Sequence, residues 1–143
     1  MIGVNTNYVL DTNSLIMSLS SRNKYSYIWD AFVTGRYSLC VTNEILTEYE
    51  EVISRNINQR VARIVLSYFM LLPNVKFVDP HYSFGLIHAD FDDNKFVDCA
   101  IVANASCIVT QDHHFDVLST IDFPKVDVID IDEFLKILLS EVN

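Results

Sequence analysis

Four acidic residues lie where predicted strands and helices would carry them to one edge of a sheet: Asp11, Glu48, Asp98 and Asp112. Asp11 comes directly after the apolar run Tyr8–Leu10, and Asp112 comes directly after the run Cys107–Gln111. A carboxylate just past the C-terminal end of a buried strand faces the crevice in which open α/β sheets bind ligands. Carboxylates gathered there repel one another unless a divalent cation neutralises them, so these positions predict a metal site.

Two adjacent histidines, His113 and His114, raise zinc as an alternative ion. No cysteine stands at zinc-ligand spacing, and aspartates flank the pair, so an oxygen-ligand site for Mg²⁺ or Mn²⁺ is favoured. His114 is also a candidate contact to a substrate phosphate.

Glu48 and Asp98 each lie on an expected helix, beside its apolar face. In the helix expected over Glu44–Arg55, Glu48 is the acidic residue closest to the buried stripe and can point into a cleft; a solvated acidic face is the alternative. In the helix expected over Asn94–Ala105, Asp98 lies one turn in, amid apolar residues. A carboxylate in that setting is costly unless it reaches water or a partner, and a metal ion would be such a partner.

Helix caps compete with function for short polar side chains. Caps are expected from Thr12 or Asn13, from Thr42 or Asn43, from Asp92 or Asp93, and from Asp130. This assignment leaves Asp11 without a structural duty, which strengthens the functional interpretation of that residue.

The elements that must position these residues alternate along the chain. Short apolar strands are expected at Tyr8–Leu10, Ser38–Thr42, Val75–Val78, Cys107–Gln111 and Val126–Ile129. Helices are expected at Leu15–Leu19, Tyr25–Thr34, Glu44–Arg55, Gln59–Leu72, Asn94–Ala105 and Ile131–Glu141. Such alternation predicts an α/β protein: a three-layer α/β/α domain around a central parallel sheet of about five strands. Residues 1–143 are expected to form a single domain.

Composition limits the setting and the kind of partner. The three cysteines form no CxxC pair and lie mainly in apolar runs, which favours reduced thiols and a cytoplasmic location. We expect no secretory signal and no membrane span. A formal net charge of −9 argues against holding nucleic acid by bulk electrostatics, although a nuclease with metal-neutralised carboxylates remains compatible with it. Arg55, Arg60 and Arg63 form either a solvated helix face or a phosphate-binding patch, in which Arg55 would contact substrate.

Four motifs taken together resemble the PIN-domain family, and in particular its bacterial toxin–antitoxin branch, the VapC-type ribonucleases. The motifs are Val9–Asn13, Thr42–Tyr49, Asp92–Ala100 and Ile108–Asp112. Each is weak alone, but all four occur in order and with intact spacing. The likeness runs from about Tyr8 to Leu135.

The resemblance implies a central parallel sheet flanked by helices, cleavage of single-stranded RNA with one or two Mg²⁺ or Mn²⁺ ions, an antitoxin protein as partner, and a homodimer. Carried across, the catalytic and metal-binding carboxylates are Asp11, Glu48, Asp98 and Asp112. The supporting residues are Asn13 and Thr110, which would orient those acids, and Asp93 and Asp116 as further acids. One departure is His114, since relatives often carry an acidic residue there, which bears on a second metal position.

Two other functions stay open at this point. A phosphohydrolase or receiver-like domain could use Asp11 as phospho-acceptor, but it would want a second acid at position 13, where Asn13 stands, or an acid pair just before strand one. A catalytically inactive PIN-like scaffold or binding module is the other alternative, and clustered like charges disfavour it. No glycine-rich nucleotide-binding motif and no GxSxG motif occurs in the sequence.

Overall fold

The computed structural model describes residues 6–88 and 90–141, in which short strands alternate with helices. The strands are β1 (Asn7–Leu10), β2 (Ser38–Val41), β3 (Val75–Phe77), β4 (Cys107–Val109) and β5 (Val128–Ile129). The α-helices are α1 (Thr12–Ser18), α2 (Ser26–Val33), α3 (Asn43–Asn56), α4 (Gln59–Leu71), α5 (Asn94–Ala103) and α6 (Ile131–Ser140). Two 3₁₀ segments complete the order: η1 (Phe91–Asp93) and η2 (His113–Thr120).

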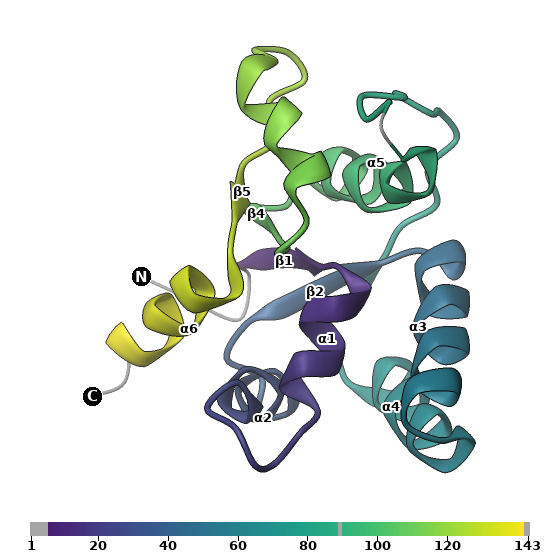
Figure 1. The fold of residues 1–143 in the computed structure, drawn as a ribbon, viewed down its shortest axis with the longest axis vertical. Coiled ribbons are helices and arrows are strands. Elements are labelled where there is room, and N and C mark those ends of the chain that lie inside the picture. The colour runs from purple at the N-terminus through teal and green to yellow at the C-terminus, as the bar shows by residue number, and fades with distance from the viewer. Residues whose placement is uncertain (1–5, 89, 142–143) are drawn as a thin grey trace.

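The strands form one parallel sheet in the order β3-β2-β1-β4-β5. Tyr8 in the central strand pairs with Leu39 on one side and with Cys107 on the other. Figure 1 shows the sheet between two layers, with α5 and η2 on one side and α1, α2, α4 and α6 on the other. The predicted α/β class, with its parallel five-stranded sheet and flanking helices, is confirmed. The prediction of a single domain over residues 1–143 includes residues 1–5, 89, 142 and 143, which lie outside the described part of the chain.

The central strands are buried on both faces, which explains why they read as continuous apolar runs. Val9, Val41, Ile108 and Val109 have no exposed surface. Burial of each such side chain stabilises the fold by roughly 1.5–3 kcal/mol. The sheet is therefore a rigid base for the residues that follow its strands. In the described residues, no helix has the length and apolar character needed to cross a membrane.

The helix caps agree only in part with the sequence predictions. The Thr42 hydroxyl accepts a bond from Ile45 N–H (3.1 Å), and Asp130 forms a capping box with Glu133, as expected. The prediction for α1 was wrong, because the cap is Asp11, whose carboxylate accepts a bond from Ser14 N–H. Helix α1 consequently begins at Thr12, three residues earlier than predicted.

For α5 the expected capping position is confirmed, but the expected capping hydrogen bond is not formed. Asp93 occupies the capping position, but its side chain makes no capping hydrogen bond. The preceding 3₁₀ turn η1 gives Asp93 helical backbone angles, with φ −71° and ψ −18°, whereas a capping residue is normally extended. Its carboxylate is therefore available for other contacts.

Candidate metal centre

The candidate site lies at the carboxyl edge of the sheet, between β1 and β4. The chain leaves β1 towards β2 and β3 on one side, then returns to β4 on the other side, so the strand order changes direction here. Open α/β sheets bind ligands at such a switch point. The backbone N–H of Asp11 donates to the carbonyl of Val109 at 3.1 Å, which fixes the residue after β1 against the end of β4.

Asp11 is held on both carboxylate oxygens. Its Oδ1 accepts a bond from Ser14 N–H at 2.8 Å, and its Oδ2 accepts a bond from the Thr110 hydroxyl. Burial raises the pKa of Asp11; the bonds from Thr110 and Ser14 counter that rise, and the charge of Asp112 adds to it. Asp11 thus combines a structural duty as a cap with a fixed position at the switch point, and its second lone pairs remain available to a ligand.

Glu48 reaches the same place from helix α3. The next residue, Tyr49, is buried and donates its hydroxyl to the carbonyl of Leu10 at 2.5 Å, which fastens α3 to the end of β1. The Glu48 Oε2 atom accepts a bond from the Thr12 hydroxyl, and Oε1 accepts a bond from Lys95 Nζ at 2.6 Å. The expectation that Glu48 points into a cleft, and not into solvent, therefore agrees with its placement.

Lys95 comes from the first turn of α5 and lies between two acids. Its ammonium is 2.6 Å from Glu48 Oε1 and 2.8 Å from Asp92 Oδ1, and its side chain is only 5% exposed. Burial by itself would lower the pKa of Lys95, but the hydrogen bonds and charges of Asp92 and Glu48 raise it overall. The lysine is therefore a buried, charged partner of the acids, and it was not singled out from the sequence.

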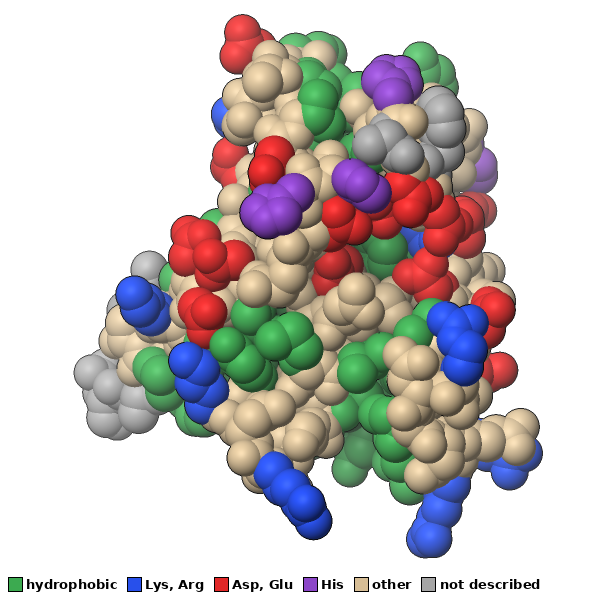
Figure 2. All heavy atoms as spheres, viewed as in Figure 1, with side chains coloured by type: hydrophobic (Ala, Val, Ile, Leu, Met, Phe, Trp, Pro, Cys, Tyr) green, Lys and Arg blue, Asp and Glu red, His purple; other side chains and the backbone are tan. Residues whose placement is uncertain are grey.

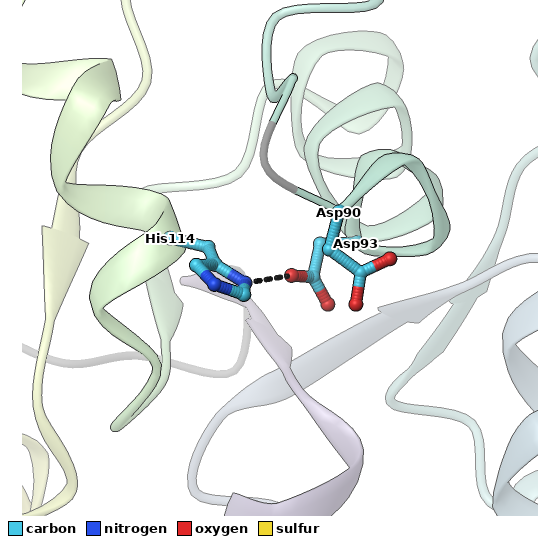
Figure 3. Close-up of side chains that lie close together, drawn as sticks. All are labelled: Asp90, Asp93 and His114. Carbon is cyan, nitrogen blue, oxygen red and sulfur yellow. Dashed lines mark hydrogen bonds and ion pairs between the residues drawn. The ribbon is translucent and has the colours of Figure 1, made fainter.

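At the other end of the site, Asp93 and Asp112 meet His114. The His114 Nδ1 atom lies 3.3 Å from Asp93 Oδ2 and 3.4 Å from Asp112 Oδ1. One ligand atom from each of Asp90, Asp93 and His114 lies within 4.8 Å of the others, so these three could hold a cation together. Figure 3 shows the carboxylates of Asp90 and Asp93 approaching from just before α5, Asp93 from η1 and Asp90 from the residue preceding η1, with the imidazole of His114 facing them from η2.

Burial raises the pKa of Asp93 to about 6; the hydrogen bond with His114 opposes the rise, and the charges of Asp112 and Asp90 add to it. The carboxylates at this end thus repel one another, and a bound cation would relieve the repulsion.

These side chains surround a hollow of about 300 Å³ on the surface. Six carboxylates line it, from Asp11, Glu48, Asp90, Asp92, Asp93 and Asp112. Asn13, which the resemblance named as a supporting residue, also lines it, and so does Arg55, for which the sequence left a solvated helix face as the alternative. Figure 2 shows acidic side chains gathered around this hollow, beside histidines.

Asp98 does not line this hollow. It lies in a neighbouring hollow of about 480 Å³, formed with the N-terminal end of α3 and residues 79–83. Its Oδ1 atom accepts a bond from Phe84 N–H at 3.1 Å. The sequence predicted that a buried carboxylate here needs a partner, and in the structure that partner is a backbone amide. Burial raises the pKa of Asp98, and that bond opposes the rise. Three of the four predicted acids therefore converge, and Asp93 stands beside them where Asp98 was expected.

Asp116 likewise lies away from the acidic hollow. It pairs with His113 at 3.1 Å on the exposed face of η2, and it lines separate hollows near β5. The resemblance suggested Asp116 as a further acid, but Asp116 lies beyond the last matching motif, which ends at Asp112.

The donor set suits a hard divalent cation. Carboxylate oxygens dominate it, with Thr110 and Asn13 as neutral oxygen-bearing neighbours, and such ligands are those that Mg²⁺, Ca²⁺ and Mn²⁺ prefer. Asp11, Glu48, Asp93 and Asp112 fit a magnesium or manganese ion, with Asp90 and His114 at the rim. Zinc is less well matched, because it prefers histidine and cysteine ligands. Among the described residues, this cluster contains one histidine, His114, and no cysteine.

The comparisons with known proteins agree with this architecture. A family profile described as PIN domain matches residues 7–114. No curated protein matches the sequence. The structure resembles that of VapBC2 from Rickettsia felis bound to a promoter DNA fragment, with a TM-score of 0.58 and 15% identity over 87% of this chain and 98% of that chain.

Two further solved structures share the fold. DNA-bound VapBC from Salmonella typhimurium gives a TM-score of 0.58 with 16% identity, over 88% of this chain and 98% of that chain. The PIN domain endonuclease Utp24 gives 0.54 with 13% identity, over 91% and 88%. At these identities the structural likeness establishes the fold, and the family assignment comes from the profile match.

Proposed function

The chain belongs to the PIN-domain family, and from that premise we propose that it is a divalent-metal-dependent endoribonuclease. Its substrate is single-stranded RNA, and the reaction is hydrolysis of a phosphodiester bond. The observation that carries the proposal is the convergence of Asp11, Glu48, Asp93 and Asp112 on one hollow at the switch point of the sheet.

The proposed ligands are these four carboxylates, and a bound Mg²⁺ or Mn²⁺ ion would supply a more acidic water molecule and neutralise charge on the scissile phosphate. The chain's own residues prepare that position. Thr110 and Ser14 fix the Asp11 carboxylate, while Thr12 and Lys95 fix that of Glu48. Arg55 lines the same hollow, where its guanidinium can contact a neighbouring phosphate.

We also propose that the protein is the toxin of a toxin–antitoxin pair, acts in the cytoplasm and forms a homodimer. The support is the fold shared with chains from VapBC complexes, which combine such a protein with a partner. An antitoxin is therefore the expected protein partner.

The phosphohydrolase alternative is weakened by the surroundings of Asp11. Asp11 is only 6% exposed, which leaves little room for the in-line approach of a phosphoryl donor to its carboxylate. An inactive scaffold remains the outcome to test against, because it would share the fold and the acidic hollow but cleave nothing.

The proposal is tested by incubating the metal-free protein with labelled single-stranded RNA of mixed sequence, with and without millimolar Mn²⁺ or Mg²⁺. We expect internal cleavage with metal and none with EDTA. Matched duplex RNA and single-stranded DNA serve as the comparison substrates. Absence of cleavage on all substrates, in a protein that still binds Mn²⁺, would favour the scaffold.

A further inference from the structure

We infer that Lys95 fills the place of a second divalent cation, so that the acidic hollow takes one metal ion and not two. This inference rests on the proposed function. It concerns how many metal ions the same site binds and which of its positive charges comes from a lysine. Two-metal nucleases clamp the attacking and leaving oxygens of the phosphate between two cations about 3.5–4 Å apart. Here the ammonium group of Lys95 already contacts two of the lining carboxylates, Glu48 and Asp92, from the side of the neighbouring hollow that contains Asp98.

The first observation is that Glu48 has no unengaged oxygen. Lys95 Nζ approaches Oε1 at 2.6 Å, and the Thr12 hydroxyl donates to Oε2. A second ion bound through Glu48 and Asp92 would need the position that the ammonium occupies, because Asp92 is also paired with it, at 2.8 Å.

The second observation is that the lysine is built into the fold. Its side chain is 5% exposed, whereas a solvent-facing surface lysine such as Lys24 is 66% exposed. Movement of the ammonium away from this place would break its contacts with both Glu48 and Asp92. Lys95 is therefore a fixed cation and not a side chain that swings aside when a metal arrives.

The third observation concerns the opposite end of the hollow. Asp93 and Asp112 there face His114, and Asp90 adds a further carboxylate close by. Three carboxylates thus face one imidazole at this end, and none of the described contacts of those three carboxylates is to a lysine or arginine. The single ion is accordingly expected among the four proposed ligands, on the side of Asp93 and Asp112, with Lys95 as a positioning residue that orients Glu48 towards it.

The test counts bound ions directly. Metal-free protein is dialysed to equilibrium against Mn²⁺, and the metal per folded chain is measured for the unaltered protein and for Lys95→Met, which keeps a similar volume without the charge. We expect one Mn²⁺ per chain in the unaltered protein and two in Lys95→Met. Lys95→Arg keeps the cation and should bind one, and so should Lys125→Met, a control at an exposed lysine.

Two ions in the unaltered protein, or a single ion in Lys95→Met, would overturn the inference. Circular dichroism confirms that each variant is folded, and Lys95→Gln replaces Lys95→Met if the latter fails to fold. RNA cleavage by the unaltered protein is measured in parallel. Mn²⁺-dependent cleavage with two bound ions would overturn the inference about Lys95 and leave the proposed nuclease intact, whereas binding of no ion would overturn both.

Discussion

At the α3 end of the acidic hollow, each Glu48 oxygen has a protein partner, Lys95 on one and Thr12 on the other. At the η2 end, Asp93 and Asp112 face His114, and burial raises the pKa of Asp93 to about 6. The first end is a satisfied network, as buried polar groups generally are. At the second end, the described contacts compensate the carboxylate charges less fully. Such incompletely compensated charges are common at ligand-binding sites. The comparison teaches that the number of carboxylates does not by itself locate a metal ion. Carboxylates that already have a cationic or hydrogen-bonding partner in the protein must be distinguished from those that do not.

The largest effect is expected from removing the charge of Asp11, which is central to both ends. Asparagine caps a helix as well as aspartate does, so Asp11→Asn should keep the fold of α1. It should reduce metal-dependent RNA cleavage by roughly 100-fold or more, since even groups outside the metal's own ligands cost 10–100-fold. Initial cleavage rates at saturating Mn²⁺ provide the measurement.

The control for that variant is Asp116→Asn, which removes a carboxylate that the structure places outside the hollow. Its cleavage rate should match that of the unaltered protein. Equal losses in both variants would mean that net charge, and not the position of Asp11, governs activity.

A second comparison sets Asp93 against Asp98, the residue that the sequence favoured. Asp93→Asn should lower cleavage and Mn²⁺ affinity by roughly 10–100-fold, because it removes a ligand from the end that lacks a lysine. Asp98→Asn should keep most of the activity, since the asparagine oxygen can still accept the bond from Phe84 N–H. The reverse ranking, measured by the same cleavage assay and by Mn²⁺ titration, would restore Asp98 as the ligand.

The contrast between Asp93 and Asp98 marks the limit of sequence reasoning. The strands, the capped helix α3 and the convergence of Asp11, Glu48 and Asp112 follow from apolar periodicity and from residues at strand ends. The segment between β3 and α5 has no periodicity. Its course is set by the Asn94 side chain, which accepts from Ile87 N–H and donates to Ile87 C=O, both at 2.8 Å. These two hydrogen bonds hold the segment against the start of α5, where the Asp98 carboxylate accepts its bond from Phe84 N–H. Contacts of this kind cannot be predicted from sequence periodicity.

Lys95 was missed for a related reason. A lysine in the first turn of a helix is normally a solvated residue, placed unfavourably for the helix dipole. Only the approach of α3 to α5 reveals that Glu48, 47 positions earlier in the chain, is its partner. The sequence does contain one signal that Lys95 could be buried and paired: it stands between the acids at 92 and 93 and the apolar run of α5.

The pH dependence of Mn²⁺ binding should show whether the η2 end of the hollow, which contains Asp93, holds the ion. A metal ion competes with the proton on Asp93, so Mn²⁺ affinity should fall by up to about tenfold per pH unit below pH 6. The fold responds with the opposite sign: Asp93 binds its proton more tightly in the folded chain, so its stabilising contribution is present below its unfolded pKa and is lost as pH rises through about 6. Calorimetric Mn²⁺ titrations between pH 5 and 8 measure the affinity. In Asp93→Asn this part of the pH dependence should disappear, and its persistence there would assign it to another group.

The smallest effect is expected at Thr12. Thr12→Val removes the hydroxyl that donates to Glu48 Oε2 and keeps the shape of the side chain. The unfolding free energy should fall by about 1.5–3 kcal/mol, the range for hydrogen bonds to charged groups. Urea unfolding measures the change, with Thr47→Val on the exposed face of α3 as the control, where about 0.5 kcal/mol or less is expected. A loss no larger than in the control would show that Lys95 alone holds Glu48.

The central claim, that this hollow binds a divalent cation, is tested most directly by the thermal unfolding of metal-free protein during a Mn²⁺ titration. An ion that binds only the folded chain stabilises it by about 2.7 kcal/mol at a concentration of 100 Kd, which raises Tm by several degrees in a domain of this size. The account predicts such a rise for the unaltered protein and a much smaller one for Asp11→Asn. A Tm that stays constant up to millimolar Mn²⁺ in the unaltered protein, or that rises equally in both, would contradict it.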